Sequence, residues 1–239
     1  MKTWAVTLLA LFAALPSAAR TLEASIDQSG MTVYIEAWGK ITVTGQMGGS
    51  LIATLSETER GFVKEERQRE PYGVRISGNR AFVWSDLPGD ITLIVPRASR
   101  IVVRSLRWGD VEVNDICGDV EATAHEGGIR LTRIGGAVVA HAGNGPVEAS
   151  LAWSRAKPAS FTSMHGAVSI TVPVGLGLAA RLKTEEGRIQ SAVPWEEALK
   201  MNAGKNQNTA ADSFHLFVYT RFGPITISRG QIDDRSACE

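Results

Sequence analysis

A glycine recurs at every ninth residue through the middle of the chain, in the segment GDVEVNDICGDVEATAHEGGIRLTRIGGAVVAHAGNGPVEAS. These corner glycines are Gly109, Gly118, Gly127, Gly136 and Gly145. A β-branched residue stands two places after each glycine, and a mostly charged residue separates it from a second apolar residue. Alternation with period two is typical of a short strand with one buried face, and glycine suits a corner that needs a positive φ.

The nine-residue spacing is part of a longer period. Seven places after glycine, an aliphatic residue is present only in alternate units, as Ile116 and Ile134. The predicted repeat is therefore 18 residues long, with two strands and two corners. Strands this short bury a face only when successive turns of the chain stack on one another, about 4.8 Å apart. The sequence therefore predicts an all-β, single-domain parallel β-solenoid (a β-helix or β-roll). An up-and-down β-sandwich is the competing fold, although it would need longer strands and no fixed return of glycine.

The same phrase, glycine followed by alternating apolar residues, recurs after Gly39, Gly89, Gly166, Gly187 and Gly223. We expect the aliphatic residues of these phrases to point into one water-free column. The predicted core contains Val111, Val113, Val120, Ile129, Leu131, Val138, Val147, Val168, Ile170, Ile189, Ile225 and Ile227.

The first residues predict an exported protein. Lys2, an apolar run from Ala5 to Leu15 and small residues up to Ala19 are typical of a signal peptide over residues 1–19. We expect an N-terminal β portion over 20–105 with a charged insertion at 57–71. We expect the regular repeat over 106–230 with a polar insertion at 195–213, and a tail over 231–239. The segment FHLFVYTRF, at 214–222, is expected to help cap one end of the coil. The predicted location is periplasmic, on the outer surface or secreted.

Charge and cysteine content narrow the classes of partner. Lys plus Arg and Asp plus Glu are both 25, so the chain has no basic field that would favour nucleic acid. No later stretch is apolar for long enough to predict a membrane span. Cys117 and Cys238 are the two cysteines. An exported compartment permits a disulfide between them, but their spacing leaves open whether they meet.

The order of four segments resembles the bacterial putative-adhesin family of β-strand-repeat domains, a family mostly without assigned function. The segments, which lie between residues 87 and 230, are LPGDITLIVPRASRIVVRSLRWGDVEV, ICGDVEATAHEGGIRLTRIGGAVVAHAGNGPVEAS, FTSMHGAVSITVPVGLGLAARLKTEEGRIQSAV and RFGPITISRG. His165 and Ala167 stand where the family usually has Asn and Asp. The resemblance implies a right-handed β-solenoid that is secreted or faces the cell envelope.

Candidate reactive groups do not form a recognised pattern. Asp110 and Asp119 follow corner glycines, but calcium-binding nonapeptide rolls need a ladder of such carboxylates, and turn chemistry explains the two. The four histidines, His125, His141, His165 and His215, lack the close spacing of zinc ligands. Cys117 is expected to pack or to form a disulfide. The sequence thus predicts no catalytic residue, no cofactor and no metal site.

The leading hypothesis is a non-enzymatic, envelope-associated or secreted binding or scaffold module, with an adhesin-like role. Its partner would be an unidentified envelope or extracellular protein or a glycan. The alternative is a carbohydrate-active β-helix enzyme, a polysaccharide lyase or hydrolase, with the outward side chains of Glu112, Glu121, Arg130 and Glu148 along one groove. Trp108, Trp153 and Trp195 are expected near corners or loops, in the core or a cap, or exposed for stacking on sugars.

Overall fold

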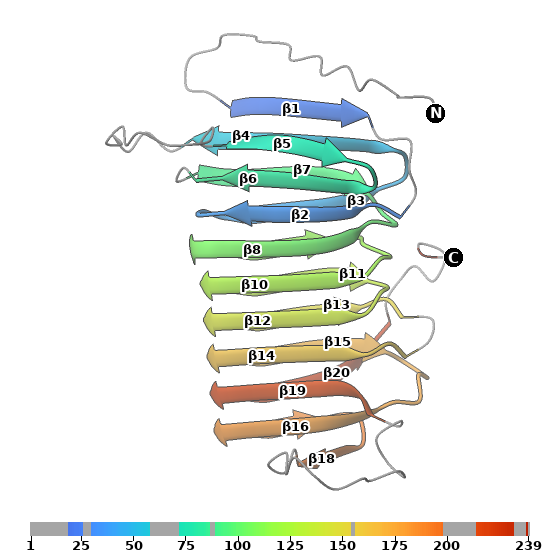
Figure 1. Ribbon diagram of the computed structural model, residues 1–239. Helices are drawn as coiled ribbons and strands as arrows, with labels where there is room; N and C mark the ends of the chain where they lie inside the picture. The colour runs from blue at the N-terminus through green and yellow to red at the C-terminus, as the bar shows by residue number, and fades with distance from the viewer. Residues whose placement is uncertain are drawn as a thin grey trace, which may run out of the picture.

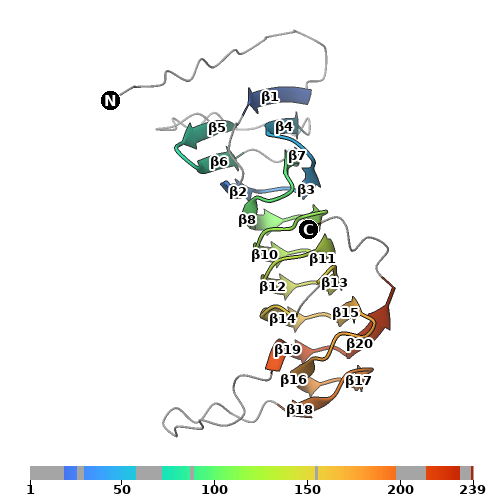
Figure 2. The same ribbon diagram turned by 90° about the vertical axis from the view of Figure 1, so that its right-hand side faces the viewer.

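The structure is a computed structural model that describes residues 19–25, 30–57, 72–86, 89–153, 156–197, 214–231 and 238. Within these ranges the chain forms twenty strands in two ten-stranded sheets, which confirms the predicted all-β class. Figure 1 shows the strands stacked like the steps of a ladder, and Figure 2 shows the two sheets side by side, each supplying one strand to a step.

The two sheets have the following strands in spatial order. Sheet A contains β1 (Ala19–Ser25), β4 (Ser50–Glu57), β7 (Gly89–Pro96), β3 (Ile41–Gln46), β9 (Val111–Asn114), β11 (Ile129–Ile134), β13 (Val147–Leu151), β15 (Val168–Pro173), β20 (Ile225–Gly230) and β17 (Ile189–Ser191). Sheet B contains β18 (Trp195–Glu197), β16 (Ala179–Glu186), β19 (Phe214–Phe222), β14 (Ala159–His165), β12 (Val138–Asn144), β10 (Val120–Glu126), β8 (Arg100–Trp108), β2 (Thr32–Ala37), β6 (Arg80–Ser85) and β5 (Tyr72–Ser77).

Successive strands of the central repeat alternate between the sheets, and each pairs in parallel with the next strand of its own sheet. Val120 on β10 lies opposite Val138 on β12, and Ile129 on β11 lies opposite Val147 on β13. Both offsets equal the 18-residue repeat expected from the sequence. We call one sheet B strand with the sheet A strand that follows it a rung. Among the described strands, pairing is antiparallel only near the N-terminal end, where β4 joins β1 and β7, and β5 joins β6.

The inner faces of the two sheets form one apolar core. Eleven of the twelve aliphatic residues expected there are at most 2% exposed: Val111, Val113, Val120, Ile129, Leu131, Val138, Val147, Val168, Ile170, Ile225 and Ile227. Ile189 is only half-buried, because β17 is the last strand of sheet A and no further strand covers it on that side. Phe161, on β14, is the largest fully buried side chain.

Two rungs lie out of sequence order. The rung β2–β3 is inserted between β6–β7 and β8–β9, and the rung β19–β20 is inserted between β14–β15 and β16–β17. Figure 1 shows β19 between β14 and β16. The expectation that residues 214–222 cap the coil is therefore wrong. Leu216, Val218 and Thr220 point inward and are buried, so β19 has the alternation of an interior strand.

Several sequence expectations fall on other parts of the chain. Residues 1–18 of the predicted signal peptide, 58–71 of the charged insertion and 198–213 of the polar insertion lie outside the described residues, as do 232–237 and 239 of the tail. The predicted starts of both insertions need correction. Glu57 is the last residue of β4 and pairs with β7, and Trp195, Glu196 and Glu197 form β18 and pair with β16. The described chain contains no helix long and apolar enough to cross a bilayer.

Candidate functional site

The glycines form columns at the corners of the rungs. One column runs through Gly89, Gly39, Gly109, Gly127, Gly145, Gly166, Gly223 and Gly187, and a Cβ on each from Gly39 onward would overlap the carbonyl of the glycine before it. Gly118 and Gly136 start a second column at the opposite corner, where a Cβ on Gly136 would overlap the carbonyl of Gly118. Glycines nine residues apart therefore lie alternately at the two corners of the stack. Glycine is required there because the backbones of neighbouring rungs approach too closely for a Cβ.

The corner aspartates bind backbone of the neighbouring rung. Asp110 accepts a hydrogen bond from the backbone N–H of Gly128 at 2.7 Å, and Asp119 accepts one from Ala137 at 2.9 Å. Asp90 does the same with the N–H of Lys40 at 3.1 Å. The predicted turn chemistry thus acts between rungs rather than within one corner.

The four histidines do not share one environment. His125 and His141 are on the outer face of sheet B, His165 stacks on Phe222 with ring centroids 5.0 Å apart, and His215 starts the buried part of β19. Across the described ranges, no three His, Cys, Asp or Glu side chains are placed to share a metal ion.

The four outward charges considered for catalysis are engaged in ion pairs. Arg130 pairs with Glu148 at 3.0 Å on sheet A, where Lys40 pairs with Glu112 at 2.9 Å. Glu121 lies on sheet B, 3.7 Å from Arg104. These residues therefore occupy two different faces of the molecule rather than one groove.

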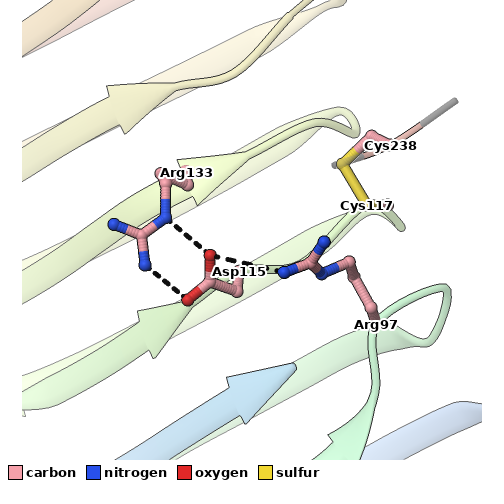
Figure 3. The surroundings of a disulfide bond; sticks show 5 residues. All are labelled: Arg97, Asp115, Cys117, Arg133 and Cys238. Carbon is pink, nitrogen blue, oxygen red and sulfur yellow. Dashed lines mark hydrogen bonds and ion pairs between the residues drawn. A yellow bond between two sulfur atoms is a disulfide. The ribbon is translucent and has the colours of Figure 1, made fainter. Parts of the chain in front are cut away.

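The two cysteines form a disulfide, with Cα atoms 5.2 Å apart (Figure 3). Close by, Arg133 donates two hydrogen bonds of 2.6 Å to Asp115, and Arg97 lies 3.8 Å from the same carboxylate. The hydrogen bonds from Arg133, aided by the charges of Arg133 and Arg97, outweigh desolvation and hold the pKa of Asp115 below its ordinary value. This cluster links three successive turns of the chain and tethers the C-terminal tail.

The three tryptophans singled out in the sequence have different environments. Trp153 is buried, and its indole Nε1 donates a 2.8 Å hydrogen bond to the carbonyl of Gly136, so it fills the second corner. Trp108 and Trp195 are exposed, at the end of β8 and the start of β18.

The outer face of sheet A is hydroxyl-rich and ion-paired. One row of outward residues, aligned across neighbouring strands, is Thr42, Glu112, Arg130, Glu148, Ser169 and Thr226. The next row is Thr44, Asn114, Thr132, Ser150, Thr171 and Ser228. This face resembles an ordinary solvated surface.

The outer face of sheet B is different, because large apolar and aromatic side chains recur on it. One aligned row is Phe82, Tyr34, Val102, Glu121, Val139, Ser160, Phe217 and Arg181. The next row is Trp84, Glu36, Arg104, Thr123, His141, Thr162, Tyr219 and Lys183. Val139 is 53% exposed, Phe217 38% and Phe82 37%, and Phe82 stacks on Tyr34 at 4.9 Å.

A shallow hollow of about 360 Å³ opens on this face. Its walls come from β12, β14, β19 and β16, and its lining includes Val139, Pro158, Phe217, Arg181 and His215. The lining is apolar and aromatic with two nitrogenous side chains, which suits binding rather than acid–base chemistry by paired carboxylates.

Sequence reasoning did not identify this surface. The alternating positions of residues 32–37, 81–85 and 214–222 do carry aromatic residues on their outward phase, and that signal was available. The order of the strands could not be predicted from the sequence. β19 lies beside β14 because the rung β19–β20 is inserted out of sequence order.

The fold and its surfaces define an all-β protein of stacked, mostly parallel strands with two chemically distinct outer faces. No protein-family model and no curated protein matches the chain. Among solved structures, it is similar to a putative cell adhesion protein from Clostridium sporogenes, with 8% identity, a TM-score of 0.44 and coverage of 89% of this chain and 100% of that one. It is also similar to a putative adhesin from Bacteroides fragilis, with 13% identity, a TM-score of 0.42 and coverage of 90% and 98%. The family resemblance stays a prediction.

Proposed function

We propose that this protein is an exported, non-enzymatic binding or scaffold module, an adhesin-like right-handed β-solenoid of a single domain that works in the bacterial envelope or outside the cell. The observation that supports this proposal is the difference between the two outer faces. Sheet B has exposed Phe82, Val139 and Phe217, whereas the outward rows of sheet A have hydroxyl groups and paired charges. Exposed apolar and aromatic side chains on a rigid sheet are typical of an interaction surface.

The rigidity of the sheet favours binding over a mobile catalytic site. The outward side chains are held at fixed spacing, because every strand of the central repeat is hydrogen-bonded on both sides and its inner face is buried. A partner that matches this spacing would bind without ordering the protein first, so less free energy is lost on association.

The test compares two triple variants. The sheet B variant carries Phe82→Ser, Val139→Ser and Phe217→Ser, and the matched sheet A variant carries Thr132→Ala, Ser150→Ala and Thr171→Ala. All six side chains point outward, so both variants should fold. We expect the sheet B variant to bind an isolated envelope fraction about tenfold more weakly than the unmodified chain, and the sheet A variant to bind it equally well.

Two results would contradict the proposal. One is equal binding of the unmodified chain and the sheet B variant to the envelope fraction. The other is turnover of a glycan by the purified chain that a single carboxylate substitution, such as Glu121→Gln, abolishes.

A further inference from the structure

Three neighbouring strands of sheet B present the same set of chemical groups twice. In one row, Ser160 on β14, Phe217 on β19 and Arg181 on β16 lie opposite one another. Two residues further along the strands, Thr162, Tyr219 and Lys183 are aligned in the same way. Each row thus presents a hydroxyl, an aromatic ring and a cation, about 4.8 Å apart across the strands. We call these six residues the double row.

The Tyr219 ring of the double row is held in place by its neighbours. The ammonium group of Lys183 lies 5.8 Å from the centre of the Tyr219 ring, and the Tyr219 hydroxyl donates a 2.9 Å hydrogen bond to Glu185. This hydrogen bond raises the pKa of Tyr219, so the ring stays neutral. Phe217 is 38% exposed and borders the hollow of about 360 Å³.

The double row itself contains two cations, Arg181 and Lys183, and no carboxylate. Near it, Arg221 on β19 lies 3.4 Å from Glu185, and Glu186 is exposed at the end of β16. On the next strand, β18, Glu196 lies beside Arg181 in the register. Within the part of the chain that the structure describes, Lys183 has no ion-pair partner, and only the Tyr219 ring engages its charge.

The imidazole of His215 lies at the edge of the hollow. Between Phe214 and Leu216 the register of β19 against β16 shifts, so His215 is the extra residue of a β-bulge. Its Nδ1 atom is buried and has no hydrogen-bond partner in the described structure. Bulges of this kind redirect a side chain and are common beside binding sites, and an unsatisfied buried nitrogen is unusual enough to need a reason.

We propose that the double row and its adjoining hollow bind an acidic polysaccharide. A pyranose ring presents a flat C–H face to Phe217 and Tyr219, the acidic substituents face Arg181 and Lys183, and ring hydroxyls bond to Ser160 and Thr162. A polymer with a repeating acid group fits because the cations, rings and hydroxyls themselves repeat. This inference rests on the proposed binding function and names the class of ligand for the same face.

The experiment measures binding of three polymers to the full chain by affinity electrophoresis and calorimetry. Polygalacturonate carries carboxylates, dextran sulfate carries sulfates, and dextran is neutral. We expect binding to at least one polyanion that weakens with salt, and no binding to dextran. Comparison of the two polyanions identifies the acid group that the cations prefer.

Three single variants locate the site. We expect Lys183→Gln and Phe217→Leu each to weaken polyanion binding about tenfold, because one removes a charge and the other removes a ring while keeping an apolar side chain. Arg104→Gln is the control, because it removes a cation of the same face outside the double row. It should stay within about twofold of the unmodified chain.

Each contrary result has a distinct meaning. Binding of dextran as strong as that of the polyanions, or loss of binding in Arg104→Gln equal to that in Lys183→Gln, would overturn the acidic-polysaccharide proposal. If the chain binds the envelope fraction through sheet B yet binds neither polyanion, the ligand class is wrong while the proposed function stands. If the sheet B variant binds the fraction normally, the proposed function itself fails.

Discussion

At the corners, a single atom decides which residue fits. A Cβ on Gly127 would lie 2.5 Å from the carbonyl oxygen of Gly109, and Gly127 has φ +134°. Residues with a side chain rarely adopt that backbone conformation. The carbonyl oxygen of Gly109 belongs to the backbone of another rung, and it cannot move without disturbing the strand pairing of that rung.

We therefore expect Gly127→Ala to lower the free energy of unfolding by about 2–4 kcal/mol. Gly177→Ala is the matched control, because nothing lies within 4 Å of its added Cβ and its φ is outside the left-handed region. The control should cost less than about 0.5 kcal/mol. Denaturant titrations of both variants measure the difference, and equal losses would show that close approach at the corner is not limiting.

The corner aspartates should also contribute to stability through single hydrogen bonds. Asp119→Ala removes the acceptor of the Ala137 N–H and should cost about 1 kcal/mol. Asp119→Asn keeps a carbonyl oxygen in the same place and should recover most of that loss. A thermal melt that ranks the Asn variant with the Ala variant would contradict the role of Asp119 as a backbone acceptor.

Asp115 predicts a dependence on pH (Figure 3). Its pKa is lowered in the folded chain, chiefly by the hydrogen bonds from Arg133, so its stabilising contribution is present above the ordinary value of 3.8 and is lost as the pH falls through the folded value. The free energy of unfolding of the unmodified chain should exceed that of Asp115→Asn at pH 7, and the gap should close below pH 3.8. A gap that is constant from neutral to acid pH would exclude this ion-pair contribution.

At the scale of the strand, alternation separates two environments. Ile129 is 1% exposed on the inner face of β11, whereas Glu121 points outward from β10 beside Arg104. Ile129→Asp would place an unpaired carboxylate in the apolar core and should cost several kcal/mol. Glu121→Ala should cost less than about 0.5 kcal/mol. Similar melting temperatures for the two variants would refute the inward assignment.

Strands that depart from aliphatic alternation compensate with hydrogen bonds. Ser163 and Thr220 point into the core, and their hydroxyls donate to the carbonyls of Gly145 and Gly166 at 2.9 and 3.0 Å. The equivalent position on β10 is Ala124, which needs no partner. At these two positions the polar residue on the inner face reaches a corner carbonyl of the neighbouring rung.

At the scale of the molecule, the disulfide joins residues 121 positions apart. It connects the tail that follows β20 to the corner between β9 and β10, and so links the out-of-order C-terminal rung to the middle of the stack. Cross-linking a segment of that length restricts the unfolded chain strongly, by roughly 4–5 kcal/mol in the chain-entropy description.

Reduction of the purified chain should therefore lower its melting temperature by several degrees without changing its strand content. The double variant Cys117→Ser with Cys238→Ser is the control, because it should melt near the reduced chain and show no response to a reductant. A melting temperature that is the same in the oxidised and reduced chains would show that the link adds nothing to stability.

The sequence by itself determined the repeat, the inward residues and the corner glycines. These features are local, since period-two alternation places side chains on one face and close stacking of corners excludes a Cβ, whichever strands become neighbours. Only the tertiary structure decided that β2–β3 and β19–β20 enter the stack out of order, and that Cys117 meets Cys238. It also decided that Phe217 and Tyr219 on β19 lie between the hydroxyls of β14 and the cations of β16. Strands with the same alternation can pair with any equivalent strand, so the choice of neighbour depends on packing across the whole core rather than on the residues of one repeat.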